Sequence, residues 1–186
     1  MMNTRLHSLS SPLRQFAGND SGISAVEFAL ILPLMITLYL GGVEVTQAVS
    51  VDRKVTLVAH TVGDLAAQSS QTIHDADMTN ILNAASAVAS PYSAANLKVR
   101  VSSITIDAQQ NLTLAWSDNQ NWSAPTASEL ATLPAALNVA NTSLIWAEAQ
   151  YSYTPTIGAV ITGTLTLKDH IYLRPRILDP VPRAHP

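Results

Sequence analysis

The sequence predicts an α+β protein. It has one long N-terminal helix, transmembrane in its inner part and packed on a small antiparallel-sheet domain in its outer part. Two observations support this prediction. Residues 23–43 are almost all apolar, and apolar residues then recur at helical spacing to about residue 67. From about residue 97 the pattern changes to the period-two alternation typical of strands.

The apolar run is long enough to cross a bilayer. Its 21 residues, 23–43, carry a single charge, that of Glu27. As a helix the run spans roughly 31 Å, close to the hydrocarbon thickness of a bilayer. An acid within such a segment costs up to about 2.5–3.5 kcal/mol, less near an interface. We therefore expect Glu27 to have a function.

Charges on either side of the run give its orientation. Before the run, Arg5 and Arg14 stand against Asp20. After it come Glu44 and Asp52, then Arg53 and Lys54. The positive-inside rule weakly favours a cytoplasmic N-terminus and an exported C-terminal domain. A cleaved secretory signal peptide is the alternative, with the mature chain starting near Val49. The apolar core of such a peptide is usually 7–15 residues, shorter than this run.

The helix is expected to continue beyond the membrane, from residue 23 to about residue 67. A stripe of apolar residues at three- and four-residue spacing supports this, formed by Val51, Val55, Val58, Val62 and Leu65. A second helix is predicted from His74 or Asp75 to about Ala89, and Pro91 ends it. Acidic residues in its first turn suit the helix dipole.

Four strands are predicted after this helix. The first, 97–106, reads as half-exposed because Lys98 and Arg100 alternate with apolar residues. A turn at 107–111 leads to a return strand at 112–116. A loop at 117–127 and a short helix at 128–137, interrupted at Pro134, come next. The last two strands are predicted at 143–153 and 162–173.

Composition argues against several functions. The net charge is −3 and no basic cluster is present, so nucleic-acid binding is not expected. The chain has no cysteine, and neither a Gly-x-Ser-x-Gly elbow nor a Gly-rich phosphate loop occurs. We expect no enzyme activity, cofactor, metal site or small-molecule substrate. The acids near His60 and His74 are better explained by helix structure than by metal binding.

The start of the apolar run resembles a known processing site. Gly22 stands five residues before Glu27, the spacing found in type IV prepilins, and Phe28 holds the position of an aromatic residue in Flp pilins. The run from Ala25 to Leu34 resembles the N-terminal signature of the TadE-like family, minor pseudopilins of the tight-adherence (Tad) pilus. Residues 147–155 and 172–176 also resemble that family.

The resemblance implies a pilin-like fold and a processed chain. Residues 1–22 would be a leader, 23–45 the transmembrane helix, 46–70 its periplasmic continuation and 71–186 the head. A prepilin peptidase would cut between Gly22 and Ile23. Glu27, Phe28 and Pro33 would serve assembly, with Glu27 paired to the new amine of Ile23. The alternative is a glutamate that lies at headgroup level.

Partners also follow from the resemblance. We expect other pseudopilins, the major pilin and the assembly platform as partners. The expected location is the bacterial inner membrane, with the pilus as the alternative. A candidate partner surface comprises Tyr151, Tyr153, Arg174 and Arg176, although solvated arginines at a strand end are the simpler interpretation. An uncleaved single-pass scaffold of the same machine is the alternative function.

Overall fold

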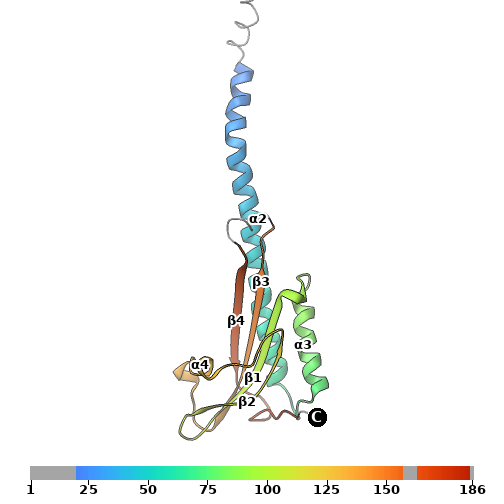
Figure 1. Ribbon diagram of the computed structural model, residues 1–186, viewed down its shortest axis with the longest axis vertical. Helices are drawn as coiled ribbons and strands as arrows, with labels where there is room; N and C mark the ends of the chain where they lie inside the picture. Colours follow the sequence, from blue (N-terminus) through green and yellow to red (C-terminus); the bar gives the residue numbers. More distant parts are fainter. Residues whose placement is uncertain (1–19, 157–162, 185–186) are drawn as a thin grey trace, which may run out of the picture. The chain divides into compact units, whose positions relative to one another are not determined.

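The structure is a computed structural model that describes residues 20–156 and 163–184. The chain divides into two compact units between Glu44 and Val45. Helix α2, Asp20–Ala67, contributes residues to both units. The first unit contains the apolar part of this helix. The second, here called the head unit, contains the rest of α2 and all the strands (Figure 1).

The predicted α+β class is confirmed. The head unit has a four-stranded antiparallel sheet in the order β2-β1-β3-β4. Its elements are α3 (Asp75–Ala89), β1 (Leu97–Ile106), β2 (Leu112–Gln120), β3 (Thr142–Tyr153) and β4 (Leu165–Leu173), with short helices η1 (Ala94–Asn96), α4 (Ala127–Leu130) and η2 (Ala135–Leu137).

The boundaries of several elements differ from the prediction. Helix α2 begins at Asp20 rather than residue 23. Strand β2 extends to Gln120, into the predicted loop, because it continues to pair with β1 as far as Val99. The predicted helix 128–137 is instead two short helices, α4 and η2, with Pro134 immediately before the second. Strand β4 begins at Leu165, later than predicted, since residues 163 and 164 are described and are not in the strand; the predicted first residue, 162, lies outside the described residues.

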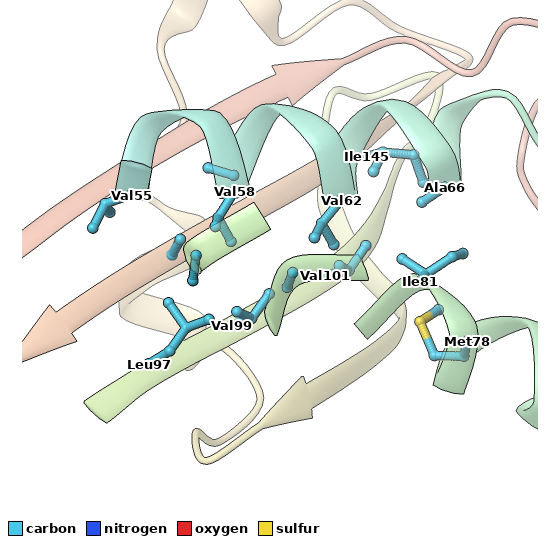
Figure 2. Packing of buried hydrophobic residues seen from close by; sticks show 14 of the residues in the cluster. Val55, Val58, Val62, Ala66, Met78, Ile81, Leu97, Val99, Val101 and Ile145 are labelled. Carbon is cyan, nitrogen blue, oxygen red and sulfur yellow. The ribbon is translucent and has the colours of Figure 1, made fainter. Parts of the chain in front are cut away.

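The main core lies between the helices and one face of the sheet. Figure 2 shows Val55, Val58 and Val62 of α2 facing apolar side chains of β1. Helix α3 adds Met78 and Ile81 to the same cluster. The predicted stripe holds except at Leu65, which is 42% exposed, while the neighbouring Ala66 is fully buried. The stripe therefore continues by a four-residue step from Val62 and not by a three-residue step.

The opposite face of the sheet is also covered, so the prediction of a half-exposed first strand is wrong. Arg100 on β1 is 1% exposed, and Ser102 is fully buried. The connection between β2 and β3, which contains α4 and η2, supplies contacts to this face. The carbonyl oxygen of Ser123 and the carboxylate of Glu129 both accept from Arg100. Alternation in the sequence correctly predicted strand β1, but it could not indicate that the connection between β2 and β3 covers this face.

Residues 181–184 pack against β2 and the start of α3 in the head unit. The indole N–H of Trp116 donates to the carbonyl oxygen of Val181 over 2.8 Å. Arg183 pairs with Asp118 of β2 and Asp75 at the start of α3. The backbone N–H of His74 donates to the carboxylate of Asp77, which caps α3. Asp75 and Asp77 therefore have the structural roles that the sequence predicts for acids at a helix start.

Candidate functional site: the N-terminal part of α2

The predicted scissile bond lies in the first turn of α2. Gly22 is exposed, and a Cβ added to it would have no heavy atom within 4 Å. No packing contact among the described residues therefore requires glycine at this position. A small residue beside a scissile bond instead suits entry of the chain into a peptidase site. The first 19 residues of the predicted leader lie outside the described residues.

Glu27 and Ile23 share one face of the helix. They are four residues apart, and side chains at that spacing are neighbours on a helix surface. Both positions are exposed, and Ile23 exposes 56% of its surface. If Ile23 became the first residue, its amine would lie one helical turn before the carboxylate. The geometry permits an ion pair within one subunit or between two.

The rest of this unit presents apolar side chains outward. Phe28 is 58% exposed, and the large side chains around it are similarly exposed: Leu30, Ile31, Leu34, Met35, Leu38 and Tyr39. One helix of the described residues, Gly22–Ala67, is long and apolar enough to span a membrane. Such exposure in water is unfavourable, and a lipid or helical environment would remove it.

Pro33 lies within this helix. It has no backbone N–H, so the i−4 carbonyl, that of Ala29, loses its usual helical donor. The hydroxyl of Thr37 donates to the carbonyl oxygen of Pro33 over 2.8 Å. Helix α2 is continuous through Pro33. Membrane helices tolerate such positions when neighbouring groups satisfy the freed carbonyl.

One known family matches the region that carries these residues. Residues 22–64 match the TadE-like protein family. The match begins at Gly22, includes Glu27 and Pro33, and confirms the predicted resemblance for the N-terminal part of the chain. The TadE-like match implies involvement in a Tad pilus, and with the apolar helix it indicates membrane association and pilus partners. No curated protein and no solved structure matches the chain.

The predicted partner surface near the C-terminus is not brought together. Tyr151 and Tyr153 are only 6% and 8% exposed and belong to the core cluster of the head unit. The phenol of Tyr153 donates to the side-chain oxygen of Gln47 on α2. These tyrosines pack β3 against the helices, so their place in the predicted surface is corrected.

Strand direction explains why the tyrosines and arginines lie apart. Strands β3 and β4 are antiparallel, with Tyr153 opposite Leu165 and Ile145 opposite Leu173. The tyrosines and the arginines that follow Leu173 therefore lie at opposite ends of the strand pair, roughly 25 Å apart at about 3.3 Å per residue. The two strands were predicted from the sequence, but this consequence of their antiparallel pairing was not.

Both arginines are exposed and lie beyond the end of β4, not on it. Arg176 pairs with Asp64 of α2, with 2.6 Å between nitrogen and oxygen, and its backbone N–H donates to the carbonyl oxygen of Ala67. Arg176 thus fastens the C-terminal segment to the end of the helix. Neither interpretation made from the sequence, solvated arginines at a strand end or a partner surface, included this ion pair.

Sequence reasoning missed a charged cluster on the second face of the sheet. Arg100 and Glu148 are each 1% exposed, lie opposite each other on β1 and β3, and form an ion pair. Glu129 and Lys168 pair with them from the covering connection and from β4. The Arg100 hydrogen bond lowers the pKa of Glu129 to about 2, helped by a bond from the backbone of Thr126. In the sequence, the signal that could have indicated this buried cluster was Glu148, an acid between Ala147 and Ala149 that follows Trp146.

Proposed function

We propose that this protein is a non-enzymatic minor pseudopilin that takes part in the assembly or priming of a Tad-type pilus used for surface attachment. Its precursor would insert through the apolar part of α2, with its N-terminus in the cytoplasm and the head unit in the periplasm. The observation that carries the proposal is the TadE-like match, which starts at Gly22 and covers a helix suited to a membrane.

Processing supplies the chemical change in this proposal. A separate prepilin peptidase would cut after Gly22 and leave a free amine on Ile23. That amine and the carboxylate of Glu27 are opposite charges, and each would be expensive to bury alone in an apolar bundle. Pairing between subunits therefore favours one docking register. Without the cut the amine does not exist, so processing would control docking.

The two units would have different roles in assembly. The exposed apolar side chains of α2 would pack against the helices of other pseudopilins and the major pilin, where dispersion contacts act without a hydrophobic driving force. The head unit would select partners and contact the assembly platform. The second candidate is an uncleaved inner-membrane scaffold, which uses the same apolar helix but needs neither Gly22 nor Glu27.

The test is the variant Glu27→Ala, with Glu44→Ala as the matched control. Glu44 is another glutamate of α2, but it lies just beyond the apolar run. Removing one partner of a buried ion pair costs about 3–5 kcal/mol. We expect Glu27→Ala to insert normally and lose most surface pili, while Glu44→Ala keeps them. Membrane fractionation and electron microscopy measure the two properties.

Normal piliation in cells that carry only Glu27→Ala would contradict the pairing role. Equal loss in both variants would indicate that any acid removed from α2 disturbs the helix. A variant that fails to reach the membrane would implicate Glu27 in insertion instead. Each of the three results is read from the same two preparations.

A further inference from the structure

The sheet of the head unit has two outer strands, β2 and β4, because its strand order is β2-β1-β3-β4. One side of an outer strand carries backbone N–H and C=O groups that no other strand of the sheet can reach. Such a side can pair with a strand of another chain unless a bulge, a proline, a charge or a covering segment prevents it. The two outer strands of this head unit differ in these features.

Strand β2 has two protecting features. Its register against β1 shifts, so that Ala115 has no partner residue in β1, and such a bulge interrupts a regular edge. The C-terminal segment also packs against β2, through the indole of Trp116 and the ion pair of Asp118 with Arg183. The outer side of β2 is therefore a poor template for another strand.

Strand β4 is a regular edge. Its nine residues pair with β3 without a shift in register, and none of them is proline. Among the described residues, no backbone–backbone hydrogen bond reaches β4 from outside the sheet. The N–H of His170 instead donates to the carboxylate of its neighbour Asp169 over 2.8 Å. Because N–H groups of an antiparallel strand alternate between its two sides, this bond indicates that the set containing His170 faces away from β3.

The side chains of β4 determine what kind of strand could pair with it. One face carries Leu167, which packs against the core, and Asp169, which accepts from Thr56 of α2. The other face carries Lys168, whose side chain is 44% exposed, although it pairs with the buried Glu148. Residues directly opposite each other in paired strands interact. A partner strand would therefore need apolar residues on the first face and acids on the second.

A second copy of β4 does not meet this need. Opposite residues of an antiparallel pair share a face, so the two-fold axis of a self-pair passes through one residue. At the middle of β4, an axis through Lys168 or Asp169 places like charges directly opposite, which is destabilising. An axis through His170 places Asp169 opposite the apolar Ile171. The edge therefore favours a strand of a different protein.

We propose that β4 binds, by antiparallel strand addition, an extended segment of a different exported protein in which apolar and acidic residues alternate. Backbone hydrogen bonds supply the affinity in this mode of recognition, and alternate side chains supply the specificity. Antiparallel addition continues the existing sheet and is slightly more stable per residue than parallel addition. The inference rests on the partner selection proposed for the head unit, but it uses no residue of the N-terminal part of α2.

The test uses the full chain in phospholipid nanodiscs and a synthetic peptide of the length of β4 in which valine and glutamate alternate. Binding should change the amide NMR signals of β4. A nitroxide at the peptide's N-terminus should broaden signals near Leu173, and one at its C-terminus should broaden signals near Leu165, as antiparallel addition requires. A peptide of alternating valine and lysine should bind about tenfold more weakly, because its charges approach Lys168.

A proline variant tests the backbone contribution. His170→Pro removes an N–H that faces away from β3, so the head unit should fold while the dissociation constant rises about tenfold. His170→Ala keeps this N–H and is the matched control, which should bind as the wild type does. If His170→Pro does not fold, a peptide N-methylated at the amides that face β4 makes the same test on the unchanged protein. Methylation of the other alternate amides is then the control.

Several results would overturn the proposal. A peptide that changes no amide signal of β4, or that binds equally well with either set of amides methylated, would exclude strand addition. Equal binding of the lysine and glutamate peptides would exclude an acidic partner. Two copies of the chain paired through β4 in one nanodisc would assign the edge to self-association. These measurements require neither cleavage after Gly22 nor pili, so their failure is distinguishable from failure of the proposed function.

Discussion

The side chain of Arg100 is buried, and its guanidinium is surrounded by acidic, polar and aromatic groups. Its guanidinium pairs with Glu148 and Glu129, donates to the carbonyl oxygen of Ser123, and lies over the rings of Trp122 and Trp146 at 4.7 and 5.1 Å. Replacing such a pair by apolar residues is often neutral, but removing one partner leaves an uncompensated charge. The cluster therefore fixes how the connection between β2 and β3 lies on the sheet.

The acid stability of the head unit should reflect this cluster. The folded-state pKa of Glu129 is lowered from 4.5 to about 2, first by its bond from Arg100. Its contribution is therefore complete above the unfolded pKa and is lost as the pH falls from about 4.5 to 2. The side chain is 38% exposed, so the contribution is at most about 1 kcal/mol. Urea unfolding followed by tryptophan fluorescence at pH 7, 4 and 2.5 measures it.

Glu129→Gln should remove that part of the pH dependence and lower stability at pH 7. Glu27→Gln, which changes an acid outside the head unit, is the control and should keep the wild-type profile. Identical pH profiles for Glu129→Gln and the wild type would show that the Arg100 contact does not favour the ionised acid.

At the scale of elements, small residues let α2 approach the sheet closely. A Cβ on Gly63 would lie 3.0 Å from the Cβ of Ala147 and 3.2 Å from side-chain atoms of Ile171 and Leu173. Gly63 is buried, and alanines of α2 face the sheet beside it at positions 59 and 66. The absence of a side chain at Gly63 therefore leaves room for the side chains of Ala147, Ile171 and Leu173 beneath the helix.

Gly63→Val should destabilise the head unit by about 1–3 kcal/mol, because overpacking forces helix and sheet apart. Gly41→Val is the control, since a Cβ at Gly41 has no heavy atom within 4 Å. Thermal unfolding of the head unit, followed by near-ultraviolet circular dichroism, measures both. A Gly63→Val protein as stable as the control would mean that the close approach is not a constraint.

Local periodicity predicted most elements, because helix and strand spacing are properties of neighbouring residues. The limits of β1 and α3 follow the pattern closely. The extension of β2 and the burial of Arg100 depend on partners elsewhere in the chain, which no local pattern contains. Gly22 and Glu27 could be proposed as a site from the sequence because both lie in one short segment. The buried pair of Arg100 and Glu148 could not be predicted, since it needs the register of β1 against β3.

At the scale of the whole molecule, the two units face different demands. The head unit buries its apolar residues between α2, α3 and the sheet, and without cysteine it depends on that core. The first unit leaves its apolar residues exposed along a helix long enough for a membrane. Stability thus resides in one unit, while insertion and the proposed docking reside in the other.

The most direct test is the N-terminal residue of the protein in cells that make pili. Mass spectrometry of the purified chain should find Ile23 as the first residue, and Gly22→Phe should retain the leader, whereas Gly41→Phe should be processed normally. An intact Met1 in piliated cells would contradict the pseudopilin proposal and favour a permanent scaffold. A chain that begins near Val49 would instead indicate release by a signal peptidase.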